Sequence, residues 1–313
     1  MGSLFNTRLI TLAELQEYIK NDTAGNEALL QSIINRVSKR FDEYCHRSFV
    51  ERVHTEYYDG DGSPELILNN MPVTRVVSLY DDIDRDFPSS DLISADDYVI
   101  YTDEGIVKLF NDEGVFQTGI QNIKVTYWAG YKTLQIETGV NDALDFTEDG
   151  GSELNATLTA NDYDVETLAT HIATVLTAAG SSTYSVEFNY STNHFEITTS
   201  EGTALVFKWN TGTNASTNAA QVLGFDSSAD GSSTTTETSD FEVLPIPEDI
   251  KEAACQQATW NWRQSFAKDG IVGMTSKSVA GQTVSFLTGR ELLPEVKSIL
   301  APYVVHPYGN RNY

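Results

Sequence analysis

The sequence predicts an α+β fold: a helical bundle and a small antiparallel β-sheet, split by an inserted α+β domain. Two helical patterns lie far apart in the chain, over residues 30–45 and 250–266. Between them, apolar residues first alternate as in strands, and an acidic stretch then covers residues 135–240. Because both helices carry an apolar stripe, we expect the long N-terminal helix to pack on the long C-terminal helix.

The first fifty residues contain two helical patterns. Thr11 and Glu14 have the spacing of a capping box, which predicts the start of a short helix. A longer helix is predicted from apolar residues that recur at helical spacing, namely Leu30, Ile33, Ile34, Val37, Phe41, Tyr44 and Cys45. Most of its basic residues fall on the opposite side, so the apolar side should be buried.

Short strands are predicted between residues 50 and 131, where the apolar period changes to two. Five or six such strands form a small antiparallel sheet whose inner face is expected to pack on the helices. The acidic, glycine-rich residues 59–62 suggest a cation loop, but an EF-hand would need Glu at the position of Asn70. A tight hairpin turn is therefore preferred.

The composition changes abruptly after Lys132. Residues 139–240 contain fifteen Asp or Glu residues and one basic residue, Lys208. Their own helix and strand patterns predict an independent α+β domain over residues 135–240, with 226–240 as a flexible return linker. The other domain, a core of helices and β-sheet, would then comprise residues 1–134 and 241–303, followed by a C-terminal arm over 304–313.

The C-terminal helix has a marked start, because Pro247 suits the first helical position. Its apolar stripe repeats every four residues, through Ile250, Ala254, Ala258, Trp262 and Phe266. The small residues in this stripe allow another helix to approach closely. Trp262 is expected in the core, whereas Trp260 points elsewhere and is the better candidate for contact between subunits.

Charge and cysteine content limit the classes of function. The formal net charge is −25, from 20 Lys and Arg against 45 Asp and Glu, so net attraction to a phosphate backbone is not expected. Such a surface lets a duplex slide past, although plain solubility is the simpler reading. Cys45 and Cys255 are expected to be buried thiols. No membrane span or signal peptide is recognised, which favours synthesis in a cytoplasm.

No pattern of catalytic residues is found, so we predict no enzyme, no cofactor and no metal. The five histidines are scattered singly: His46, His54, His171, His194 and His306. The acidic residues 81–86 could gather around a metal, but a charge run followed by Pro88 is more typical of a solvated loop. A metal-dependent enzyme is therefore the least favoured hypothesis.

A series of segments in a fixed order carries a family resemblance. The series is residues 44–49 at the end of a long helix, 72–76 before a strand, 97–98, a turn at Gly105, 125–131, 246–253, Trp262, 292–296 and 300–303. This order resembles that of the head-to-tail connector, or adaptor, proteins of long-tailed bacteriophages. The chain departs from these adaptors in the insert of about a hundred residues after residue 134.

The resemblance implies a structural virion protein of the neck, assembled in the host cytoplasm. In the family, copies form a dodecameric ring that sits under the portal and continues the DNA channel toward the tail. The partners implied are further copies, the portal, a downstream neck or tail completion protein, and DNA passing without specific binding. An arm inserts against the portal. The expected interface residues are Trp260, Tyr303, His306, Tyr308, Arg311 and Tyr313.

The insert leaves room for a second hypothesis, a carbohydrate-binding or adhesive surface protein. Trp209, Tyr184 and Tyr190 would then be the stacking platforms for sugars. Under the adaptor hypothesis, the insert is instead expected on the outside of the ring, because so many acidic residues would not fit a narrow channel.

Overall fold

The fold, seen in a computed structural model, consists mainly of strands. The structure describes residues 8–20, 25–110, 114–265, 276–279, 282–285 and 291–305. Within these ranges the strands form small antiparallel sheets of two or three strands. The predicted fold class, a helical bundle with long helices, is therefore wrong. Among the described residues only two helices exceed fifteen residues, because many segments between them alternate buried and exposed residues as strands do.

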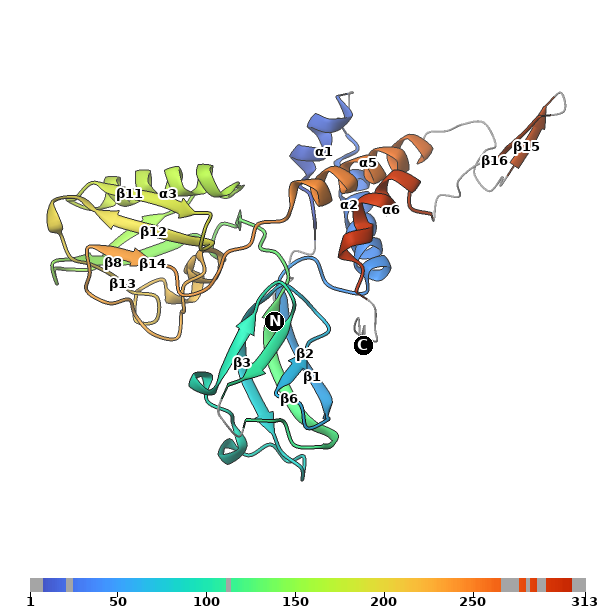
Figure 1. The fold of residues 1–313 in the computed structure, drawn as a ribbon. Coiled ribbons are helices and arrows are strands. Elements are labelled where there is room, and N and C mark those ends of the chain that lie inside the picture. Colours follow the sequence, from blue (N-terminus) through green and yellow to red (C-terminus); the bar gives the residue numbers. More distant parts are fainter. Residues whose placement is uncertain are drawn as a thin grey trace.

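The helical body gathers the first and the last described helices of the chain around one core (Figure 1). It contains α1 (Leu12–Ile19), α2 (Glu27–Cys45), α5 (Glu248–Ser265) and α6 (Pro294–Leu300). α2 contacts α5, and the capping box is present: the Glu14 amide donates to Thr11 Oγ1 over 3.0 Å. Ala254 and Ala258 are fully buried, which permits the close approach of helices. The last predicted stripe residue, Phe266, lies outside the described residues.

The β lobe below the helices in Figure 1 contains two three-stranded sheets. The first has the order β1 (Arg52–Gly60), β6 (Gly119–Ala129), β3 (Val73–Asp81), and the second the order β2 (Glu65–Ile67), β5 (Ile106–Leu109), β4 (Tyr98–Tyr101). Their inward residues form a core of their own, which includes Val125 and Tyr127. The sheet thus does not pack on the helices as expected. Residues 59–62 are no hairpin turn, because β1 and β2 belong to different sheets.

The insert forms a third body with a separate core. Its sheets are β13-β8-β9 and β11-β12-β14, its main helix is α3, and its remaining elements are small. The bounds are β7 (Gln135–Ile136), β8 (Ala143–Glu148), β9 (Leu154–Thr157), β10 (Asn161–Asp162), α3 (Val165–Ala179), β11 (Tyr184–Asn189), β12 (His194–Thr199), β13 (Leu205–Phe207), α4 (Ala220–Leu223) and β14 (Thr236–Thr238). Residues 226–240 are not a free linker, because β14 pairs with β12.

Two further strands, β15 (Ser276–Val279) and β16 (Gln282–Ser285), pair as a hairpin between α5 and α6. In the part of the chain that the structure describes, no helix is both long and apolar enough to cross a membrane.

The buried alanines of α5 give a first prediction. Ala254→Leu should lower the free energy of unfolding by about 1 to 3 kcal/mol, because the site has no space for a larger side chain. Glu252→Leu places the same side chain at an exposed position of the same helix and should stay within about 0.5 kcal/mol of the parent. Urea unfolding measures both; equal effects would contradict the tight contact at Ala254.

Candidate assembly interface

The three bodies meet at Lys132, where the chain leaves the β lobe. Its Nζ lies 2.7 Å from Glu51 Oε2, and each of these two side chains is only 8% exposed. The same Nζ donates to the carbonyl of Gln221 in the insert, over 2.7 Å. The Lys132 amide donates to the carbonyl of Leu244, where the chain returns from the insert. One residue therefore joins the β lobe, the insert and the segment leading to α5.

A second contact ties the segment that returns from the insert to the β lobe. The Arg75 guanidinium lies 4.8 Å from the ring centre of Trp128 and 4.5 Å from that of Phe241. Such stacking of Arg between aromatic rings is favourable and geometrically specific. Thr74, the preceding residue, donates to Glu51 Oε1 over 2.6 Å. Thr74 thus helps to hold Glu51 in place for its pair with Lys132, which in turn contacts the insert.

A hollow of about 1040 Å³ lies between α2 and β1, and we call it the junction cleft. Six basic or imidazole side chains line it: Arg8, Lys39, His46, Arg47, Arg52 and His54. In a chain with 20 Lys and Arg against 45 Asp and Glu, this is a local concentration of cations. Asp42, Glu43 and Glu137 also line the cleft. The cleft is therefore suited to a small anionic group more than to a broad anionic surface.

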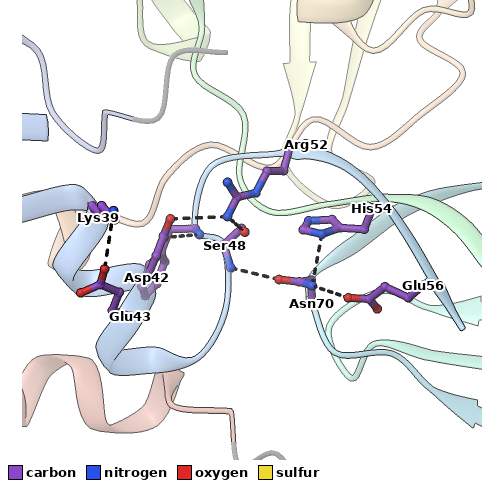
Figure 2. Close-up of polar contacts among 9 residues, drawn as sticks. Lys39, Asp42, Glu43, Ser48, Arg52, His54, Glu56 and Asn70 are labelled. Carbon is purple, nitrogen blue, oxygen red and sulfur yellow. Dashed lines mark hydrogen bonds and ion pairs between the residues drawn. The ribbon is translucent and has the colours of Figure 1, made fainter. Parts of the chain in front are cut away.

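The end of α2 forms one wall of the junction cleft. His46 adopts a left-handed conformation, with φ of 54°, and turns the chain out of the helix. The Asp42 carboxylate then accepts a hydrogen bond from the Phe49 amide at 2.9 Å. It also lies 3.7 Å from Arg52, a contact drawn in Figure 2. Burial raises the pKa of Asp42, although both of these partners favour its ionised form. Asp42 therefore fixes the path from α2 to β1.

Asn70 forms the opposite wall and links three segments (Figure 2). Its Oδ1 accepts the Ser48 amide at 3.0 Å, and its Nδ2 lies 3.3 Å from His54 Nδ1 and 3.3 Å from Glu56 Oε1. Burial lowers the pKa of His54 in spite of Glu56 nearby, so the ring is neutral at pH 7. His54 Nε2 is buried and lacks a hydrogen-bond partner among the described residues.

Arg47 is the most buried cation of the junction cleft, with 7% of its surface exposed. Its Nη2 donates to the Met71 carbonyl, and its guanidinium lies 5.2 Å from the Phe49 ring centre and 5.6 Å from that of Tyr131. Its Nε has no hydrogen-bond partner within the described ranges. Burial lowers the pKa of Arg47, but a guanidinium remains charged at pH 7. A buried cation thus faces the cleft incompletely paired.

The predicted interface residues lie in different places. Tyr303 is half-buried, donates to the Asp249 carboxylate at 3.0 Å, and has its ring 5.8 Å from that of Phe49. The Val305 amide donates to the Cys45 carbonyl, so this segment lies against the end of α2. Trp260 is half-buried on α5, away from the residues that line the cleft.

Four predicted interface residues lie outside the described residues: His306, Tyr308, Arg311 and Tyr313. Conversely, the sequence reasoning missed the roles of Lys132, Arg47 and Asn70. The scarcity of Lys and Arg could have indicated these roles, because each cation next to an acidic insert is expected to pair with a carboxylate.

Two of the three proposed sugar platforms are buried in the insert. Trp209 is 2% exposed and stacks between Phe207, at 4.6 Å, and Phe225, at 5.1 Å. Tyr184 is 4% exposed and donates to Glu148 over 2.7 Å. Neither ring offers a face to a ligand, and Tyr190 alone is exposed. The geometry therefore does not support the carbohydrate hypothesis.

The acidic loop at residues 81–86 is organised around Asp82. The Asp82 carboxylate accepts the amides of Asp84, Asp86 and Phe87 at 2.9, 2.8 and 2.7 Å. The Asp82 side chain thus stabilises the turn of its own loop. Over the residues that the structure describes, no group of three or more His, Cys, Asp or Glu side chains could hold a metal ion.

Comparison with known families identifies the first half of the fold. Residues 8–149 match the model of the head completion protein family. The match spans α1, α2, the whole β lobe and the first strands of the insert. Over this part of the chain, the match agrees with the predicted resemblance to head-to-tail connector proteins, which are structural proteins of the phage virion.

Solved structures of gene transfer agent particles also resemble the chain. One, of the neck of an empty particle computed with C6 symmetry, is 12% identical, covers 42% of this chain and 70% of that chain, and has a TM-score of 0.33. Another, of the virion of a native particle, is 14% identical, covers 40% and 66%, and has a TM-score of 0.31. Likeness at this level supports no further inference. No curated protein matches the chain.

The buried pair at Lys132 gives a second prediction. Lys132→Met should cost about 3 to 5 kcal/mol of unfolding free energy, because Glu51 would remain buried without its partner. The double variant Lys132→Met with Glu51→Gln should be milder. Lys39→Met removes an exposed pair with Glu43 and should cost less than about 1 kcal/mol. Urea unfolding tests these values, and similar losses for both lysine variants would refute the assignment.

Glu237 in β14 gives a pH prediction. Burial, together with the nearby Asp240 carboxylate, raises its pKa from 4.5 to about 7. As pH rises from about 4.5 to 7, the unfolded chain ionises first, so stability falls over that range and stays lower above it. Glu237→Gln should therefore raise the melting temperature at pH 8 more than at pH 5.

The control for this prediction is Glu187→Gln at an exposed position of β11. This control variant should change the melting temperature by the same amount at pH 5 and at pH 8. A Glu237→Gln variant whose gain is the same at both pH values would contradict the assigned protonation.

Proposed function

We propose that this chain, a structural protein of the phage virion neck, is an adaptor that forms a ring joining the portal to the tail. The match of residues 8–149 to the head completion protein family carries this proposal. The dodecameric ring, the continued DNA channel and the downstream completion protein follow from the resemblance to connector proteins. A net charge of −25 supports passage of DNA without specific binding.

The proposed division of the chain follows the predicted boundaries. Residues 1–134 and 241–303 form the adaptor core, residues 135–240 the insert, and residues 304–313 the arm toward the portal. A separate hydrophobic core in the insert supports this division. Residues Lys132 and Pro245 also pair as neighbouring backbone segments, so the chain leaves and returns at one place. That is how a domain inserts into another fold without disturbing it.

We place the insert on the outside of the ring, where its charge does not narrow the channel. The proposed contacts of the core are Trp260 with the next copy and Tyr303 with the portal side, together with His306, Tyr308, Arg311 and Tyr313 in the arm. The partial exposure of Trp260 supports an intersubunit role, because tryptophan is enriched among the residues that contribute most to protein interfaces.

The native mass of the chain tests the proposed function. We expect a ring-sized species, or a monomer that joins the portal ring of the same phage in a fixed multiple. Trp260→Ser should weaken assembly by about tenfold or more, since an interface tryptophan often contributes about 2 kcal/mol. Tyr190→Ser, an exposed aromatic of the insert, is the control and should leave the mass unchanged. A wild-type monomer that ignores the portal would refute the adaptor function.

A further inference from the structure

We propose that the junction cleft is a carboxylate-binding site, in which Arg47 pairs with an acidic side chain from the insert of a neighbouring copy. This inference rests on the proposed ring and specifies how its copies recognise one another. We infer this in three steps, each from one observation. One cation in the cleft is incompletely paired, no described carboxylate of the same copy is paired with it, and the chain as a whole is acidic.

The first step is the state of Arg47. Its side chain is 7% exposed and is hydrogen-bonded to the Met71 carbonyl and to Tyr131. Among the described residues it nevertheless forms no ion pair, and its Nε is unpartnered. A buried polar group that lacks a partner is costly, and a charged one is more so. His54 adds a second buried nitrogen without a partner in the same cleft. Two unsatisfied groups in one hollow indicate a missing acceptor.

The second step concerns the carboxylates already present. Asp42 is held by the Phe49 amide and by Arg52, and Glu43 lies 3.9 Å from Lys39 at the rim. Glu56 accepts the hydroxyl of Tyr127 at 2.7 Å. Each of these groups therefore has a role of its own in the described structure. Glu137, the remaining carboxylate of the lining, forms no ion pair with Arg47 among the described residues. No described carboxylate of the same copy is thus paired with Arg47, and a second copy can supply one.

The chemistry of the cleft selects a carboxylate. A guanidinium presents a planar fork that matches a carboxylate or a phosphate. The acidic lining residues Asp42, Glu43 and Glu137 would repel a polynucleotide backbone, which brings repeated charges. A single carboxylate carries only one negative charge and can enter between these acidic lining residues. We therefore assign a peptide carboxylate in preference to DNA.

The third step identifies a second copy as the source. Rings are built from heterologous contacts, in which one surface of a copy meets a different surface of the next. Residues 139–240 offer fifteen Asp or Glu residues against Lys208, including the exposed Glu166 and Glu187. In Figure 1 the insert lies beside the helical body and above the β lobe.

The test uses the full chain assembled with its portal, prepared from equal amounts of ¹⁵N-labelled and unlabelled protein. A carbodiimide joins carboxylates to amines in contact, and Lys39 supplies an exposed amine at the rim. We expect mass spectrometry to find mixed-isotope cross-links between Lys39 and acidic residues of 139–240. Cross-links within one copy only, or to the portal only, would overturn the inference.

A matched pair of variants gives the second arm. Arg47→Gln should raise the concentration needed for half assembly by about tenfold or more, a change of about 1.4 kcal/mol. Arg36→Gln removes the same charge from an exposed position of α2 outside the cleft and should leave assembly unchanged. Circular dichroism establishes whether each variant is folded, and the cross-linking arm uses the wild-type chain alone.

The outcomes separate this inference from the proposed function. A ring that forms without cross-links from Lys39 to a second insert refutes the cleft and leaves the adaptor standing. Absence of any ring, alone or with the portal, refutes the adaptor and removes the inference with it. Assembly that is unaffected in a folded Arg47→Gln variant would also overturn the role of Arg47.

Discussion

The buried ion pair between Lys132 and Glu51 is the contact on which the arrangement of the three bodies depends. Removing two charges from water is costly, so such a pair is stable only with good geometry and further hydrogen bonds. Both are present, because Lys132 also donates to Gln221 and Glu51 also accepts from Thr74. A pair of this kind defines position more than it adds stability. Its geometry requires the insert to sit in one place.

That constraint changes what the insert can be. An acidic segment of about a hundred residues on a loose tether would spread away from the rest of the acidic chain. Here Arg75, stacked between Trp128 and Phe241, adds a second fixed point close to the first. Two contacts at different points restrict the rotation of the insert against the β lobe as well as its distance from it. The acidic surface of the insert therefore has a defined direction, which a binding surface in a symmetric ring requires.

The sequence predicted local features and failed on long-range ones. The capping box at Thr11 and the stripe through Ala254 depend on nearby residues, and both are present. The fold class was wrong because the strand pairing of β1 with β6 rather than β2 depends on distant residues. The prediction of a flexible linker over residues 226–240 failed because this stretch, which contains β14, has the polar composition of a linker. The junction cleft was missed because α2, β1 and Asn70 meet only in the fold.

Under the proposed function, the distribution of cations accounts for an acidic chain that both assembles and lets DNA pass. Among the described residues, Lys132 and Arg75 join the insert to the β lobe, while Arg52 orders the end of α2. Cations used internally cannot attract phosphates, so the remaining surface repels DNA and also repels other copies. Assembly then needs an attraction confined to one small, recessed place. Arg47, buried and incompletely paired, is suited to that role because it attracts a carboxylate without presenting a basic surface to DNA.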